Sequence, residues 1–174
     1  MGSSLLQFVH PALEKSRVNS RLLRRAAALE EITVNDLYEV YPDFQIDAKR
    51  EQSLMEEHDK IIFQFPFYWY SSPALLKEWF DITLQYGWAY GKGADALVGK
   101  RAKIAVTTGG AEESYSREGY NGFSMDELLR PLHCTLKLCG MEWGEPFYVH
   151  NALHLNGAEM DRLLADYETW LLED

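Results

Sequence analysis

Short apolar runs alternate with helical patterns along the chain. Residues 5–9 form the first apolar run, and the amphipathic stretch 17–29 follows after a loop, so the chain is predicted to open with a strand and a helix. Residues 61–65 are apolar except for Gln64, which is typical of a strand covered on both faces. Further strands are predicted at 32–37, 104–106 and 147–149, and further helices at 47–57, 74–84, 124–138 and from 156 onward.

Several predicted helices carry recognisable signals at their ends. Ser72 before Pro73 is typical of an N-cap followed by proline at the first helical position. Pro131 lies inside the predicted helix 124–138 and predicts a kink there. Two capping boxes are predicted, one for Ser124 with Glu127 and one for Asn156 with Glu159.

Strand and helix thus alternate five times along the sequence. Such alternation predicts an α/β fold with a parallel sheet and helices on both faces. The length of 174 residues suits one domain and no linker or repeat divides the chain, so we expect a single domain over residues 1–174. Because no G-x-G-x-x-G motif follows the first strand, a Rossmann dinucleotide-binding fold is the weaker alternative.

The loop after the first predicted strand has the features of a phosphate site. Ligands of open parallel sheets bind where the strands end, and residues 10–19 lead from such an end into a helix. Backbone amides at a helix N-terminus, together with the side chains of Ser16 and Asn19, suit an anion. The alternative is that Ser16 only caps its own helix, and the spacing alone favours that alternative.

Two further loops follow predicted strands and suit a flat ligand. Phe67, Tyr68, Trp69 and Tyr70 come directly after the most apolar strand, where they form either part of the core or the wall of a pocket. The paired glycines in the segment 107–110 follow the next strand and let a planar ligand approach the backbone, although a plain turn would look the same. Three ambiguous loops at one edge of a sheet support one another.

Charge and cysteine content exclude several classes of protein. The formal net charge of −10 disfavours a nucleic-acid partner. Cys134 and Cys139 lack the spacing of a redox or zinc motif, and His150 with His154 lacks the glutamate of H-E-x-x-H, so we expect no metal site. Without a basic leader or a long apolar run, the chain is expected to be soluble and cytoplasmic. Lys60, just before a strand, is interpreted as a solvated charge.

Taken together, the loops resemble the NAD(P)H:quinone oxidoreductases of DT-diaphorase type, and in particular the ancillary flavoproteins of bacterial glutathione-gated potassium-efflux systems. The resemblance runs from about residue 8 to about residue 151. It is carried by H-P-x-x-x-x-S-x-x-N at 10–19, Y-P-D-F-x-I-D at 41–47, F-Q-F-P-F-Y-W-Y at 63–70, S-x-P-A-L-L-K-E-W-F-D at 71–81, G-W-A-Y-G at 87–91 and T-T-G-G at 107–110.

The resemblance implies a flavodoxin-like fold with strand order 2-1-3-4-5 and a bound flavin, with FMN the first choice and FAD possible. It also implies that NAD(P)H is the co-substrate and that a quinone or similar planar molecule accepts the electrons in a ping-pong cycle. The residues that it assigns to the cofactor are His10, Ser16, Arg17, Val18, Asn19, Pro66, Phe67, Tyr68, Trp69, Tyr70, Thr107, Thr108, Gly109, Gly110 and Tyr115.

Tyr115 and Asn121 are the catalytic candidates that the resemblance implies. The family pairs a tyrosine at the first position with a histidine six residues on to stabilise the reduced flavin, whereas this chain has Asn121 there. An amide cannot release a proton at neutral pH, so the relay of the family is in doubt.

The family forms homodimers, in which Trp88 and Tyr90 would line a neighbour's pocket. One alternative function is a regulatory subunit of a potassium-efflux transporter, held at the inner face of the membrane through that partner. Another is a single-electron carrier of flavodoxin type, which the acidity of the chain fits.

Overall fold

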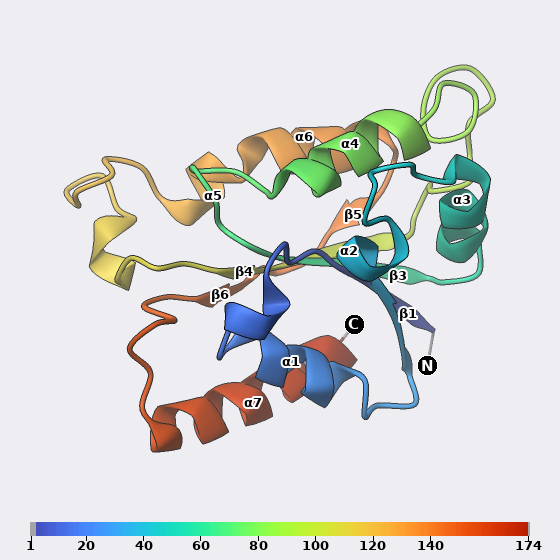
Figure 1. Ribbon diagram of the computed structural model, residues 1–174. Coiled ribbons are helices and arrows are strands. Elements are labelled where there is room, and N and C mark those ends of the chain that lie inside the picture. Colours follow the sequence, from blue (N-terminus) through green and yellow to red (C-terminus); the bar gives the residue numbers. More distant parts are fainter. Residues whose placement is uncertain (1–2, 174) are drawn as a thin grey trace.

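Parallel strands form the centre of the molecule, and helices cover both faces of the sheet (Figure 1). The computed structural model describes residues 3–173. The strand order is β2-β1-β3-β4-β5, with β6 also paired to β4, which confirms the flavodoxin-like α/β fold and the order 2-1-3-4-5. The strands are β1 (Ser4–Phe8), β2 (Ile32–Asp36), β3 (Lys60–Pro66), β4 (Arg101–Thr107), β5 (Glu142–Trp143) and β6 (Phe147–Val149).

The fifth position of the sheet is shared by two short strands. The predicted strand 147–149 is confirmed as β6, which pairs with the end of β4, and β5 pairs with the start of β4. Directly after β5 the Gly144 N–H donates to the Ala102 carbonyl at 2.8 Å, so the ladder extends one residue beyond β5. With only two residues, β5 is too short to leave a hydrophobic pattern in the sequence.

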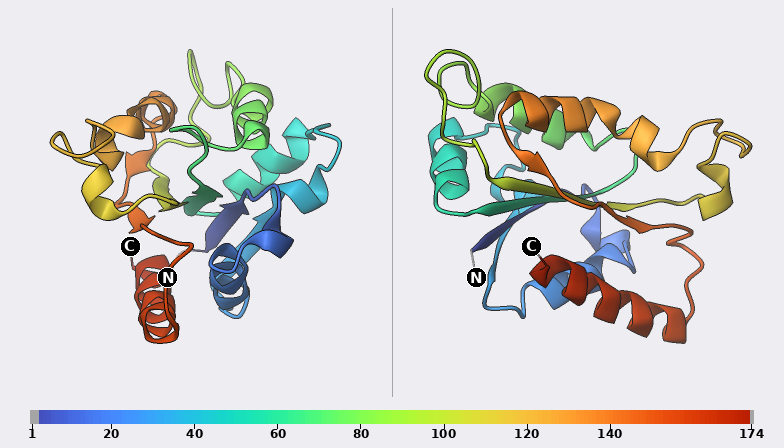
Figure 2. Two further views of the ribbon diagram at one scale, coloured as in Figure 1. Left: turned by 60° about the vertical axis from the view of Figure 1, so that its left-hand side comes forward. Right: turned by 180° about the vertical axis from the view of Figure 1, so that it is seen from behind.

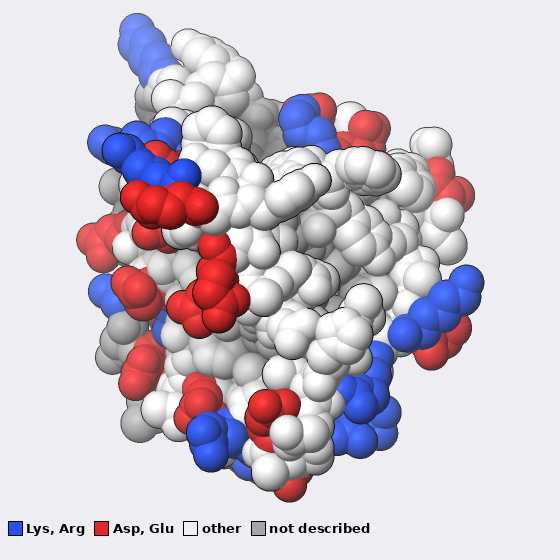
Figure 3. Space-filling view, turned by 90° about the vertical axis from the view of Figure 1, so that its left-hand side faces the viewer, with Lys and Arg blue, Asp and Glu red and all other residues white. Residues whose placement is uncertain are grey.

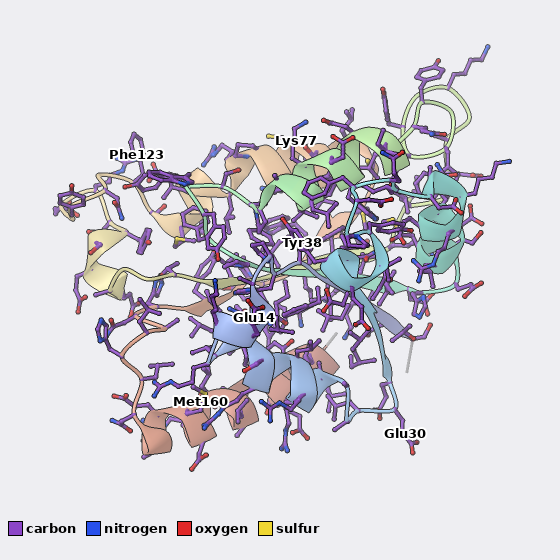
Figure 4. All side chains as sticks on the ribbon, in the orientation of Figure 1. Glu14, Glu30, Tyr38, Lys77, Phe123 and Met160 are labelled. Atoms are coloured by element: carbon purple, nitrogen blue, oxygen red, sulfur yellow. The ribbon has the colours of Figure 1, made fainter. Side chains whose placement is uncertain are left out.

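Helices α1 and α7 lie on one face of the sheet, and α3, α4 and α6 lie on the other (Figures 1 and 2). Below the sheet, α1 and α7 pack with Leu6, Phe8 and Ile62; above it, α3, α4 and α6 pack with Leu5 and Ile61. Figure 4 shows Met160 of α7 in the lower layer and Lys77 of α4 at the upper surface. The helices are α1 (Asn19–Ala26), α2 (Leu37–Val40), α3 (Ala48–Glu56), α4 (Ala74–Thr83), α5 (Met125–Leu128), α6 (Arg130–Leu138) and α7 (Gly157–Leu172), with 3-10 turns η1 (Leu13–Lys15) and η2 (Glu112–Ser114).

The predicted helix ends are confirmed in part. Both capping boxes form, one before α5 and one before α7. The predicted kink at Pro131 is a full break: α5 ends before Leu129, and proline lies in the first turn of a new helix, α6, where its missing N–H costs nothing. The predicted cap at Ser72 is wrong, because Pro73 is the N-cap of α4 and no side chain caps that end.

A buried carboxylate ties the first two strands to the upper helices. The Glu51 side chain of α3 accepts hydrogen bonds from Gln7 of β1 (3.1 Å), Asn35 of β2 (2.9 Å), Tyr41 (2.7 Å) and Trp79 of α4 (2.8 Å). Such a satisfied network fixes how the elements pack. It therefore holds β1 and β2 side by side just before they end at the candidate site.

Candidate functional site

Loops at the carboxyl ends of β1, β3, β4 and β6 enclose a cleft of about 300 Å³. This volume lies at the lower end of the range of roughly 300–1,000 Å³ that is usual for small-molecule sites. Figure 3 views the molecule from this end, and the middle of the face is mostly uncharged, with charged side chains around its margin. The cleft is lined by His10, Ala12, Lys15, Ser16, Asn19, Pro66, Phe67, Tyr68, Thr107, Thr108, Gly109, Ala152 and Leu153.

One end of the cleft offers polar groups at the start of α1. The Ser16 hydroxyl oxygen accepts hydrogen bonds from the backbone N–H and the side-chain Nδ2 of Asn19, both at 3.1 Å. Asn19 Nδ2 also donates to Thr107 Oγ1 at 3.0 Å, whereas Asn19 Oδ1 is buried without a partner among the residues that the structure describes. Ser16 therefore does brace its own helix start, but neither of these bonds uses its hydroxyl hydrogen, which stays available to a ligand.

His10 adds a neutral donor to the same end. Burial lowers the pKa of His10, and nearby Glu14 opposes this shift only in part. The Ala12 N–H donates to His10 Nδ1 at 3.1 Å, so the neutral ring carries its hydrogen on Nε2. Lys15 contributes a cationic side chain to the lining. A donor imidazole, a hydroxyl and a lysine together suit an anionic group.

The aromatic end of the cleft is built on a strained turn. Tyr68 and Ser71 exchange two backbone hydrogen bonds of 3.0 Å, and the two residues between them, Trp69 and Tyr70, both have left-handed backbone angles, with φ of 52° and 60°. Such a turn usually contains Asn-Gly, because left-handed geometry costs other residues roughly 1–2 kcal/mol each. Trp69, which follows Tyr68 of the cleft lining, is 93% exposed, and backbone strain of this kind clusters at functional sites.

The glycine loop after β4 supplies open backbone. A Cβ atom built on Gly109 would meet no atom within 4 Å, so this glycine leaves space at the cleft. A Cβ on Gly110 would lie 3.1 Å from the Tyr115 hydroxyl, so this glycine makes room for the phenol. Tyr115 in turn meets Phe67 edge-on, with ring centroids 6.2 Å apart. Backbone amides next to a flat aromatic wall are suited to a planar ring with polar edges.

The structure gathers most of the predicted site residues at this cleft. Of the predicted residues outside the lining, Gly110, Tyr115 and Tyr70 adjoin it, and Tyr70 donates to Asn121 Oδ1 at 3.1 Å. Val18, by contrast, is buried in the core below the sheet, and Arg17 donates to the carbonyl of Leu155. The nine predicted residues that line the cleft are His10, Ser16, Asn19, Pro66, Phe67, Tyr68, Thr107, Thr108 and Gly109.

The sequence missed the residues that the loop after β6 brings to the site. Ala152 and Leu153 line the cleft, and His150 bonds to Thr108 from behind it. The signal was present, because the rule that ligands bind where parallel strands end applies to β6 as it does to β1, β3 and β4.

Comparison with known proteins gives one family over nearly the whole chain. The family described as having the flavodoxin-like fold matches residues 5–171. The glutathione-regulated potassium-efflux system ancillary protein KefG of Cronobacter sakazakii is 43% identical over 169 residues, which cover 97% of this chain and 92% of that protein.

Solved structures give the same picture of the fold. General stress protein 14 of Treponema denticola, in complex with FMN, has a TM-score of 0.91 at 38% identity and covers 97% of both chains. An NADPH-quinone reductase from P. pentosaceus has a TM-score of 0.89 at 30% identity and covers 97% of this chain and 96% of that one. A protein described as a thermophilic tryptophan halogenase from S. violaceusniger has a TM-score of 0.95 at 42% identity, covering 98% and 99%.

Within the described residues 3–173, none of the helices combines the length and the apolar character needed to cross a bilayer.

Proposed function

Because the chain belongs to the family with the flavodoxin-like fold, we propose that it is an FMN-dependent reductase that passes two electrons from NAD(P)H to a quinone or similar planar acceptor. The observation that carries the proposal is that a polar end at α1, an aromatic wall and an open glycine loop meet in one cleft. The relatives named as an NADPH-quinone reductase and as an FMN complex support it.

The residues of the cleft fit FMN. Asn19 Oδ1 is a buried acceptor without a partner among the described residues, as expected where a ligand hydroxyl completes the bonding. Ser16, His10 and Lys15 would hold the phosphate, and the space beside Gly109 would take the edge of the ring. When bound, the flavin would supply the redox chemistry, which is hydride transfer between the nicotinamide and the acceptor.

The chain's own part is to orient the ligands and to place donors where negative charge develops. The amides of Gly109 and Gly110 and the Tyr115 phenol lie at one side of the cleft, where they would stabilise that charge. The Asn121 amide cannot release a proton at neutral pH, and its oxygen accepts a hydrogen bond from Tyr70, which joins the loop after β4 to the loop after β3. Its proposed role is to hold Tyr70 at the wall of the site.

A homodimer forms part of the proposal, with Trp88 and Tyr90 lining the neighbour's pocket. Tyr90 is 36% exposed and meets the more exposed Tyr86, with ring centroids 5.7 Å apart, so aromatic surface is available for a partner. The second candidate function, regulation of a potassium-efflux transporter at the inner face of the membrane, is favoured by the similarity to KefG. Co-purification with such a transporter would support it.

Steady-state kinetics test the proposed activity. With NADPH and a soluble quinone both varied in the presence of FMN, we expect quinone-dependent NADPH oxidation and parallel double-reciprocal lines, because both ligands use one cleft in turn. Intersecting lines would contradict the ping-pong cycle, and no quinone-dependent oxidation would contradict the reductase. Halide-dependent consumption of tryptophan would instead favour the activity named for the S. violaceusniger relative.

A further inference from the structure

His150 contacts the glycine loop through a hydrogen bond to Thr108. Its Nδ1 lies 3.0 Å from Thr108 Oγ1, and the Thr108 hydroxyl lies 2.8 Å from the Gly110 carbonyl oxygen, which can only accept. When Thr108 donates its one hydrogen to that carbonyl, it accepts from His150, and His150 then carries its hydrogen on Nδ1. The imidazole is one end of a chain of bonds that runs through Thr108 to the backbone of Gly110.

The same imidazole supports the tyrosine at the site. The rings of His150 and Tyr115 stack with centroids 5.2 Å apart and planes 29° apart, and the Tyr115 hydroxyl lies over Gly110. The backbone of the loop after β6 adds to the support: Asn151 N–H donates to the Gly110 carbonyl at 2.9 Å and Ala152 N–H to the Thr108 carbonyl at 3.0 Å. One side chain thus touches both elements that border the aromatic end of the cleft.

We propose that His150 is a positioning residue that holds Tyr115 and the backbone of Thr108 to Gly110 in the geometry that receives the flavin ring. It does so in a chain whose Asn121 stands where the family carries its histidine. This inference rests on the proposed function, because it assigns a role at the same cleft. His150 is not among the residues that line the cleft, and it acts through its contacts with Thr108 and Tyr115.

The surroundings of His150 favour the neutral ring that this role needs. The groups that face it are Glu112 and Glu113 from η2, Tyr115 just after η2, Tyr148 from β6 and Thr108. Burial lowers the pKa of His150 and outweighs the two glutamates, which act to raise it. A neutral ring with its hydrogen on Nδ1 both donates to Thr108 and stacks on the phenol at neutral pH.

Nitrogen NMR of the ligand-free protein tests the geometry first. With ¹⁵N-labelled histidine, and with His150 assigned from the His150→Asn variant, we expect a neutral ring protonated at Nδ1 at pH 7. Neutral histidines in solution favour the other tautomer, so this signature is specific. A ring protonated at Nε2, or rapid exchange between tautomers, would overturn the proposal.

FMN titration of three variants then tests the role. His150→Asn keeps a donor near the position of Nδ1 and loses the ring, whereas His150→Phe keeps a ring and loses the donor. His154→Asn, four residues on in an exposed position of the same loop, is the matched control. Fluorescence quenching measures the FMN dissociation constant of each variant, and circular dichroism checks its fold. If His150→Phe does not fold, Thr108→Val removes the same hydrogen bond from the other side.

We expect His154→Asn to bind like the wild type and His150→Asn to stay within roughly threefold of it. His150→Phe is expected to bind about five- to tenfold more weakly, as the loss of one partly buried hydrogen bond implies. A His150→Phe variant that binds like the wild type, or an asparagine variant as weak as the phenylalanine variant, would overturn this inference and leave the proposed function standing. A wild-type protein that binds no FMN would overturn both.

Discussion

Removal of the buried Glu51 carboxylate is expected to destabilise the protein strongly. The Glu51 side chain is 0% exposed, and four neutral donors point at it, from Gln7, Asn35, Tyr41 and Trp79. In Glu51→Ala these donors lose their acceptor, and the space of the carboxylate is left behind. Because Asn35 also donates to Gln7 Oε1 at 2.7 Å, part of the network keeps a partner.

The size of the effect follows from which partners become unpaired. An unsatisfied buried donor costs about 1–3 kcal/mol, and such costs do not add when the groups can rearrange. The Arg50 side chain, the ionic partner of Glu51, is 41% exposed, so water solvates its charge in the variant. Loss of this ion pair therefore adds little to the destabilisation. We therefore expect Glu51→Ala to lower the free energy of unfolding by about 3–5 kcal/mol, which is close to values for broken buried pairs. For a chain of this length that corresponds to roughly 6–20 °C in the melting temperature.

Urea unfolding followed by tryptophan fluorescence measures this loss. Glu57→Ala, an exposed glutamate at the end of the same helix, is the matched control and is expected to change stability by less than about 0.5 kcal/mol. A loss of less than about 1 kcal/mol in Glu51→Ala would refute the reasoning, because the network would then contribute no more than one exposed hydrogen bond.

Three further predictions follow from the site and its surroundings. Gly109→Val is expected to leave the melting temperature unchanged, because a Cβ at this position meets no atom within 4 Å. It is expected to weaken FMN binding roughly tenfold or more, because the side chain fills space proposed for the ligand. An unchanged FMN dissociation constant would count against placing the flavin ring beside Gly109. Of the two thiols, Cys134 is exposed, whereas Cys139 is buried and burial raises its pKa to about 11. DTNB should therefore react with one thiol in the native protein and with both in denaturant. Rapid reaction of two thiols in the native protein would contradict this. Burial lowers the pKa of His10 and of His150 below the ordinary 6.5, so the unfolded chain takes up protons first and the free energy of unfolding should fall as the pH drops below about 6.5. In the His10→Asn variant the melting temperature should depend less steeply on pH below that value. An unchanged slope would show that His10 does not contribute to the pH dependence.

The fold could be predicted from the sequence because its signals are local. Apolar runs marked the strands, and both capping boxes form as expected. What the sequence could not give depends on contacts between distant segments. The interpretation of Lys60 as a solvated charge is wrong: it is buried in β3, and its Nζ donates to the carbonyl of Leu171, 111 residues on, at the end of α7. The residues around a lysine at the start of a strand do not indicate that a helix terminus packs against it.

The candidate site was predictable to the extent that it follows strand ends. The loops after β1, β3 and β4 were found because they follow predicted strands and contain residue types suited to a phosphate or a flat ring. The loop after β6 is not predicted in this way, because Ala152 and Leu153 are chemically plain and the spacing of His150 and His154 points only to a metal motif. Its stacking on Tyr115, 35 residues away, arises only from the packing of β6 beside β4.

The absorption spectrum of the purified protein, with the released chromophore identified by chromatography, tests the central claim most directly. If the cleft at the strand ends is a flavin site, the protein carries FMN or takes it up when FMN is added, with a shifted and structured flavin band, and the Gly109→Val variant takes up less. A wild-type protein whose spectrum stays that of its own aromatic residues after incubation with FMN and with FAD would contradict the account.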